Sequence, residues 1–149
     1  MSNLSTTNIV SVVMAIIYQD GKYLMQLRDD IPNIVYPGVW GFFGGHMEPG
    51  EEPEAALKRE LVEEINYLPP TVTKFRTSQA GNYMRYMFSC PLTVPVSELE
   101  LNEGWDLKLV TPEEILQGYA YSERAIAPKP LGDIHQQIML DFMTTVTQH

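Results

Sequence analysis

The chain of 149 residues contains a single cysteine, Cys90, so it cannot form a disulfide bond within itself. A lone cysteine is typical of a protein from a reducing compartment. Cys90 lies in an apolar stretch with no histidine near it in the sequence, and Pro91 follows it. We therefore interpret Cys90 as a buried structural residue and not as a catalytic thiol.

Long apolar runs and basic residues are also scarce. No apolar run approaches the ~20 residues that a membrane span needs, and the first ten residues lack the positive flank and apolar core of a signal peptide. Ten Lys and Arg against nineteen Asp and Glu give a net charge of -9, which argues against binding bulk nucleic acid or an anionic membrane through a basic surface. We expect a cytoplasmic protein without such partners.

The composition that remains is that of an ordinary globular protein, with 44% hydrophobic and 19% charged residues. The length predicts one domain with one core. We expect residues 9–149 to form this domain and residues 1–8 to be a flexible N-terminus.

The order of apolar and turn-forming segments predicts an α/β fold. Expected strands precede and follow one helix along the sequence, and a second long helix ends the chain. A loop containing Pro128 and Pro130 is expected before that last helix. The expected strands are Ile9 to Tyr18, Lys22 to Arg28, Val39 to Phe43, Leu68 to Ala80, Tyr83 to Leu92 and Trp105 to Val110. The expected helices run from Glu52 or Pro53 to about Asn66, from Pro112 to about Gly118, and from Asp133 to about Val146.

The first of these helices carries three glutamates, Glu60, Glu63 and Glu64, within roughly a third of its circumference. Like charges at this spacing repel each other. An acidic helix is often only a solvated face, but this clustering also predicts a bound divalent cation, because Mg²⁺ takes oxygen ligands and often binds a few carboxylates together with substrate phosphates.

The residues around this cluster resemble the Nudix box, G-x5-E-x7-R-E-U-x-E-E-x-G-U, in which U is a bulky apolar residue. The resemblance runs from Gly45 to Tyr67, and Asn66 stands where the family has its last glycine. Asn tolerates the left-handed conformation that ends many helices, so this departure is mild. The matching positions are Gly45, Glu51, Arg59, Glu60, Leu61, Glu63, Glu64 and Tyr67.

The resemblance implies a Nudix-type α/β/α sandwich, with a mixed central sheet between the box helix and the C-terminal helix. It also implies a hydrolase that uses Mg²⁺, with Mn²⁺ as a substitute, to cleave the pyrophosphate bond of a nucleoside diphosphate linked to another moiety. A nucleoside triphosphate, a nucleotide sugar and a dinucleotide all remain open as substrates. A homodimer is left open as well.

The same resemblance assigns roles to residues of the box. It makes Glu60, Glu63 and Glu64 the metal ligands, with a backbone carbonyl of Gly44 or Gly45 as a further ligand. Either Glu60 or Glu64 is then the expected general base.

Two residues of the expected catalytic set have other interpretations. Arg59 is the expected ion-pair partner of Glu51, which would orient the neighbouring carboxylate, although it could also be a surface arginine. Some Nudix members take a carboxylate from a later loop, and Glu103 is the candidate here. Its alternative is a solvated loop residue.

Residues for substrate binding are harder to assign. Tyr36 and Phe42 could stack on a base, but one of Phe42 and Phe43 is expected in the core because a strand alternates its faces. His46 and Arg85 could contact a phosphate or face solvent, and Gly44 and Gly45 could let the backbone approach the substrate.

Two other functional classes remain. A non-catalytic Nudix domain that senses a nucleotide is disfavoured because such domains tend to lose box carboxylates. An isomerase of isoprenoid diphosphates would be expected to need a longer chain and a catalytic cysteine, and Cys90 lies in the wrong surroundings.

Overall fold

The computed structural model describes residues 9–31 and 37–147. Residues 1–8, which we expected to be a flexible N-terminus, lie outside this range. The strands are β1 (Val10–Gln19), β2 (Lys22–Leu27), β3 (Trp40–Gly41), β4 (Phe43–His46), β5 (Thr73–Ala80), β6 (Tyr83–Pro91), β7 (Asp106–Val110), β8 (Tyr119–Ser122) and β9 (Ala127–Pro130). The helices are α1 (Pro53–Ile65), α2 (Pro112–Gln117) and α3 (Asp133–Thr147), with a short 3₁₀ helix, η2 (Val96–Glu98).

Strand β1 is the centre of a seven-stranded mixed sheet. It pairs in parallel with β6 and antiparallel with β2 and β4, while β3 and β7 both pair antiparallel with β2 and β5 pairs antiparallel with β6. The β1–β2 turn has Asp20 and Gly21 at positive φ (52° and 75°), the conformation expected of a two-residue hairpin turn. The predicted hairpin is therefore confirmed.

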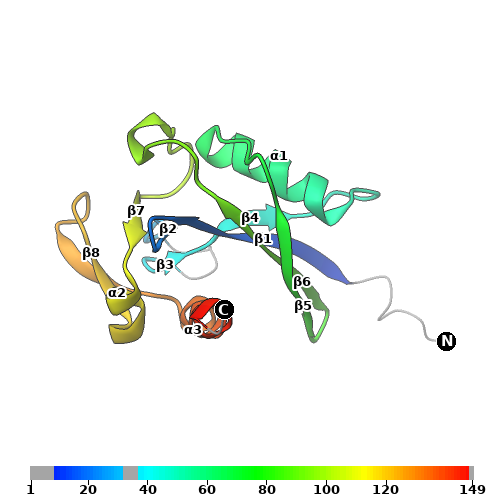
Figure 1. Cartoon of the computed structure of the whole chain (residues 1–149). Helices are drawn as coiled ribbons and strands as arrows, with labels where there is room; N and C mark the ends of the chain where they lie inside the picture. The colour runs from blue at the N-terminus through cyan, green and yellow to red at the C-terminus, as the bar shows by residue number, and fades with distance from the viewer. Residues whose placement is uncertain (1–8, 32–36, 148–149) are drawn as a thin grey trace.

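Helices cover both faces of the sheet (Figure 1). On one face α1 packs on β4 and β1, and its apolar residues Leu57, Leu61 and Ile65 are fully buried. On the other face α3 packs with α2 around Trp40 and Met139. This is the α/β/α arrangement that the sequence predicted.

Helix α1 begins with Pro53 in its first turn and ends at Asn66. Asn66 has φ 56° and ψ 44°. Its backbone N–H donates to the Val62 carbonyl at 3.0 Å, and the Tyr67 N–H donates to the Leu61 carbonyl at 3.4 Å. The left-handed end predicted for Asn66 is confirmed. Helix α2 is also as predicted, because Thr111 and Glu114 form a reciprocal capping box before it.

Two strands differ from the prediction. The strand expected over Val39 to Phe43 is interrupted, and its second part, β4, continues to His46, so that Gly44 and Gly45 pair with β1 in place of forming a loop. Strand β5 begins at Thr73 and not at Leu68. The intervening Pro69 and Pro70 carry no backbone N–H and cannot donate to a strand ladder.

The loop expected around Pro128 and Pro130 is instead strand β9, which pairs with β8 in a two-stranded sheet. The prediction was wrong because prolines argue against a strand only where the partner strand needs their N–H groups. The hairpin packs beside β7, and Trp40 Nε1 donates to the Ala120 carbonyl at 3.0 Å.

In the part of the chain that the structure describes, helices are too short or too polar to cross a membrane.

Candidate active site

Glu60 and Glu64 from α1 converge on the end of β4. The side chain of Glu60 is 14% exposed and Glu64 as a residue 5% exposed, so both carboxylates are withdrawn from bulk solvent. The Gly44 N–H donates to Glu64 Oε1 at 3.0 Å. Strand β4 and helix α1 are thereby joined at the site.

Glycine at position 45 lets the Glu60 carboxylate lie directly against β4, because a larger residue would displace the end of that side chain. A Cβ atom on Gly45 would lie 2.5 Å from Glu60 Oε1, a distance that real side chains do not reach. Gly44 has φ +146°, and a Cβ there would collide with the Val13 carbonyl of β1. The two glycines therefore let the carboxylates of α1 lie directly against β4.

Arg59 pairs with Glu51 as predicted. Its Nε donates to Glu51 Oε2 at 2.6 Å and its Nη2 to Glu51 Oε1 at 3.0 Å, a two-pronged contact that fixes the box loop on the helix. This contact, helped by the Glu48 N–H, lowers the pKa of Glu51 to about 2. Nη1 also donates to Glu60 Oε2 at 3.0 Å, so Arg59 holds Glu60 in place as well.

Glu63 occupies a different position from Glu60 and Glu64. Its side chain is 58% exposed, receives a long contact from Arg59 Nη1 at 3.4 Å, and is absent from the residues lining the cleft. The three glutamates share one arc of the helix, but only two of them line the cleft. A direct ligand role for Glu63 remains a prediction.

Glu103, from the loop before β7, lines the same cleft as Glu60 and Glu64. Burial raises the pKa of Glu64 to about 9, and the neighbouring carboxylates of Glu60 and Glu103 act in the same direction, against the hydrogen bond from Gly44. Glu64 therefore keeps its proton at neutral pH unless a positive charge binds directly beside it.

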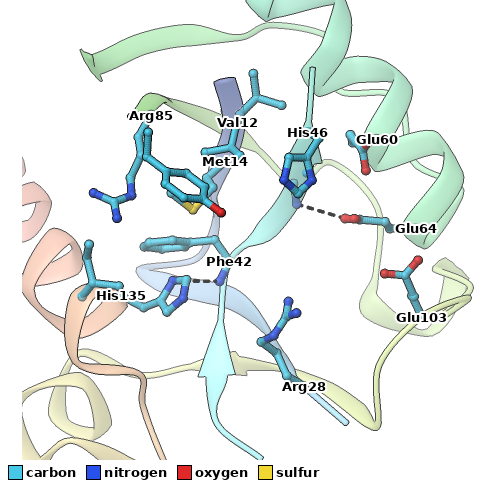
Figure 2. Close-up of a pocket in the computed structure, with 15 residues that line it drawn as sticks. Val12, Met14, Arg28, Phe42, His46, Glu60, Glu64, Arg85, Glu103 and His135 are labelled. Atoms are coloured by element: carbon cyan, nitrogen blue, oxygen red, sulfur yellow. Dashed lines mark hydrogen bonds between the residues drawn. The ribbon is translucent and has the colours of Figure 1, made fainter. Parts of the chain in front are cut away.

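The cleft has a volume of about 520 Å³. Figure 2 shows Glu60, Glu64 and Glu103 on one side of it, which we call the carboxylate side, and Arg85 and His135 on the opposite side, with Phe42 between them. Phe42 is 4% exposed and packs edge-on against the His135 ring, with 5.0 Å between the two ring centroids. Arg28 completes the wall beside Glu103.

His135 is held neutral at physiological pH. Burial lowers its pKa to about 4, and the positive charges of Arg28 and Arg85 add to this effect. The Phe42 N–H donates to His135 Nδ1 at 3.4 Å, so the proton of the neutral ring is on Nε2. The ring lies against Gly41 and Gly132, where a Cβ would come within 3.1 Å and 2.7 Å of it.

The carboxylate side fits a hard divalent cation. Glu60 and Glu64 supply oxygen donors, and Gly45 leaves room beside them. Among residues 9–31 and 37–147, no three His, Cys, Asp or Glu side chains are arranged to enclose a metal ion. An open pair of carboxylates is nevertheless sufficient for Mg²⁺, which commonly completes its shell with water and substrate phosphates.

The structure brings most of the predicted residues to this cleft: Gly44, Gly45, His46, Glu60, Glu64, Phe42, Arg85 and Glu103. Tyr36 lies outside the described residues. Cys90 is buried, as predicted, and burial raises the pKa of its thiol to about 12.

Sequence reasoning missed His135, Arg28 and Met14 as cleft residues. No local spacing identifies them, because they come from α3, the residue after β2 and the middle of β1, and only the folded sheet brings them together. For His135 the one available signal was a histidine in the first turn of an amphipathic helix, which most often has no functional meaning.

Comparisons with known proteins agree with this geometry. The family model of the NUDIX domain matches residues 7–129. The nucleoside triphosphatase NudI of Escherichia fergusonii is 45% identical over 124 residues, which cover 72% of this chain and 85% of that protein. For NudI of Escherichia coli K12 the match is confined to 56 residues, so the chain spans only 38% of that relative's length.

Solved structures show the same fold. The Escherichia coli ORF135 protein has a TM-score of 0.66 at 27% identity, over 96% of this chain and 94% of that one. The NUDIX domain of Shewanella oneidensis NrtR, solved with ADP ribose, has a TM-score of 0.65 at 19% identity, over 93% and 87% of the two chains. The box residues, the two-sided cleft and the match over residues 7–129 together show that this chain belongs to the NUDIX domain family.

Proposed function

We propose that this protein is a Mg²⁺-dependent pyrophosphohydrolase that cleaves a small nucleoside diphosphate linked to another moiety. The observation that carries the proposal is the convergence of Glu60 and Glu64 on Gly44 and Gly45 at one side of the cleft. Nucleoside triphosphates are the first substrates to test, because a relative that matches 72% of this chain is a nucleoside triphosphatase.

Glu60 and Glu64 are the residues that would hold the cation, with a Gly45 carbonyl, Glu63 and Glu103 as further candidates. When bound, Mg²⁺ would neutralise charge on the phosphate oxygens and lower the pKa of a nearby water. It would also favour the ionised form of Glu64, whose pKa is raised without a counter-charge.

The chain's own residues divide the remaining work. Glu60 or Glu64 would accept the proton of the attacking water, and Arg59 would keep Glu60 in position through its contact at 3.0 Å. The diphosphate would lie at the carboxylate side, which directs the nucleoside towards Phe42 and Arg85. Phe42 lines the part of the cleft where a base would lie, and Arg85 offers donors to a base carbonyl or a phosphate.

The direct test is to incubate the protein with a panel of nucleoside triphosphates, nucleotide sugars and dinucleotides in the presence of Mg²⁺, and to measure release of mononucleotide. Glu54→Gln is a matched control, since Glu54 lies on the same helix, is exposed and pairs only with Lys58 among the described ion pairs. Mononucleotide release by the wild type and by Glu54→Gln is expected, and loss of release in Glu64→Gln. Binding without release for every nucleotide would instead favour a sensing domain.

Metal binding has its own test, because a ligand that binds only the folded state raises its melting temperature. Mg²⁺ or Mn²⁺ is expected to raise the melting temperature of the wild type and to raise that of Glu60→Gln less. Glu63→Gln decides whether Glu63 is a direct ligand: a wild-type response would remove it from the ligand set. The metal site would be overturned if the metal left the melting temperature unchanged in the wild type and in every variant.

A cytoplasmic location remains a prediction from the single cysteine.

A further inference from the structure

The loop of residues 100–104, which we call the Glu103 loop, lies across the C-terminal end of α1. The Glu100 N–H donates to the Ile65 carbonyl at 3.1 Å, and the Asn102 N–H donates to the Glu64 carbonyl at 2.9 Å. These carbonyls belong to the last turn of the helix, where carbonyl groups have no hydrogen-bond donors within the helix. The Glu103 loop therefore supplies hydrogen bonds that the box helix itself cannot make.

Side chains complete this contact. Asn102 Nδ2 donates to the Glu63 carbonyl at 3.0 Å, so Asn102 occupies two successive carbonyls of the helix with its main chain and its side chain. Asn66 Nδ2 donates to Glu100 Oε2 at 3.2 Å. A glycine at position 66, as in the Nudix box, could not make that bond, so the one departure from the box adds a contact with the Glu103 loop.

The other end of the loop is fixed on β2. The Trp105 N–H donates to the Leu27 carbonyl at 2.8 Å. Gly104 has φ +100°, and a Cβ there would lie 2.8 Å from Gln26 Oε1. Glu103 is thus held between α1 on one side and β2 on the other, and it lines the cleft beside Glu64.

From these contacts we infer that Asn102 is a positioning residue, which holds Glu103 beside Glu64 so that the box helix and the Glu103 loop form one carboxylate site before any metal binds. Asn102 is the residue next to Glu103, and it is bonded to the main chain of Glu63 and Glu64. A shift of the helix end therefore moves Glu103 with it. The catalytic meaning of this arrangement rests on the proposed function.

The test combines two measurements that need no nucleotide. Amide hydrogen exchange of residues 100–105 in the metal-free protein reports whether the loop is held. Mn²⁺ affinity, measured by calorimetry for Asn102→Ala, Glu103→Gln and the double variant, reports whether Asn102 acts through Glu103. We expect Asn102→Ala to speed exchange in the loop, and each single substitution to weaken Mn²⁺ binding by on the order of tenfold. The double variant should bind Mn²⁺ no more weakly than Glu103→Gln alone.

Two further variants keep the test decisive. Asn102→Asp retains the size of the side chain but has no Nδ2 donor, so it should reproduce the loss even if Asn102→Ala folds poorly. Asn66→Gly removes only the exposed bond to Glu100 and should weaken Mn²⁺ binding less than Asn102→Ala does.

The inference is overturned if the two substitutions weaken Mn²⁺ binding independently, because Asn102 would then act on the fold and not through Glu103. It is equally overturned if Asn102→Ala and Asn102→Asp leave exchange and affinity at wild-type values, or if Glu103→Gln binds Mn²⁺ normally. Failure of the proposed function would look different, since the wild type would bind Mn²⁺ and cleave no nucleotide.

Discussion

The two sides of the cleft are built from different kinds of sequence. On the carboxylate side, Glu60 and Glu64 come from one continuous segment, helix α1 with its preceding strand β4, and only Glu103 is added from a distant loop. On the opposite side, Arg85, His135 and Phe42 come from β6, α3 and the link between β3 and β4. A side made mostly from one continuous segment can perform the same chemistry in many proteins, whereas a side assembled from distant segments can change one residue at a time. We expect the carboxylate side to set the rate and the opposite side to set the choice of nucleotide.

The largest expected effect is on the carboxylate side. Glu60→Gln or Glu64→Gln should lower kcat by ~10² to 10⁴, whichever of them is the base that accepts the proton of the attacking water. Glu103→Gln should lower kcat less, and Glu54→Gln should leave it unchanged. Steady-state kinetics at saturating Mg²⁺ on the cleaved nucleotide measures all four. A collapse confined to Glu103→Gln, with both box variants near the wild type, would move the base to the Glu103 loop.

The opposite side should respond in a different parameter. Arg85→Ala removes a charged donor from the cleft, and a hydrogen bond to a charged group contributes about 1.5–3 kcal/mol. We expect kcat/KM to fall by about 10- to 100-fold, mostly through KM, and by different factors for different nucleotides. Lys22→Ala, at the exposed β1–β2 turn, controls for the loss of one positive charge. If Arg85→Ala had the kcat/KM of the wild type for every nucleotide of the panel, Arg85 would be in solvent during turnover.

A smaller effect concerns the proton on Glu64. Its pKa is about 9 in the metal-free folded protein against 4.5 as the ordinary value, so the folded state binds more protons than the unfolded state between these limits. The contribution of protonated Glu64 to stability is complete below pH 4.5 and is lost as the pH rises through about 9. Over this range the free energy of unfolding falls by up to about 1.4 kcal/mol per pH unit.

His135, with its pKa lowered to about 4 from 6.5, acts in the opposite sense below pH 6.5. Urea unfolding with a chelator at several pH values between 6.5 and about 8, below the range in which the buried Cys90 thiol contributes, therefore isolates Glu64. Stability should fall with pH in the wild type and less steeply in Glu64→Gln. Parallel slopes in the two proteins would show that Glu64 is not protonated in the fold.

The smallest effect is at the end of the box helix. Asn66→Gly should be nearly neutral, because glycine also adopts the left-handed conformation, while Asn66→Val should cost about 1 kcal/mol or more. Chemical denaturation of the two variants makes the comparison. Equal stabilities would mean that the conformation seen at Asn66, φ 56° and ψ 44°, is not what ends the helix.

The same contrast between local and distant residues explains what the sequence could predict. The Arg59–Glu51 pair, the ends of α1 and the β1–β2 turn depend on residues fewer than ten positions apart, and all were predicted. The separation of Glu63 from Glu60 and Glu64 could not be predicted, because it depends on where β4 lies against the helix.

Distance in the sequence also hid the opposite side of the cleft. His135 meets Phe42 across 93 residues, and no pattern in either segment indicates the other. Strand β9 was missed for another reason: its prolines are compatible with pairing on one edge only, and a one-dimensional pattern does not say which edge is free.

The two prolines of β9 have a consequence for self-association. Pro128 and Pro130 alternate along the strand, and Leu131 between them and α3 donates its N–H towards Gly118 at the start of the hairpin. The nitrogens of both prolines must therefore face away from β8, where neither can donate a hydrogen bond. Another chain cannot add a regular strand there. Tyr119 and Tyr121 of this hairpin are exposed, so an unprotected edge would favour aggregation. Strand β9 has one charged residue, Lys129, and its two prolines supply the rest of the protection.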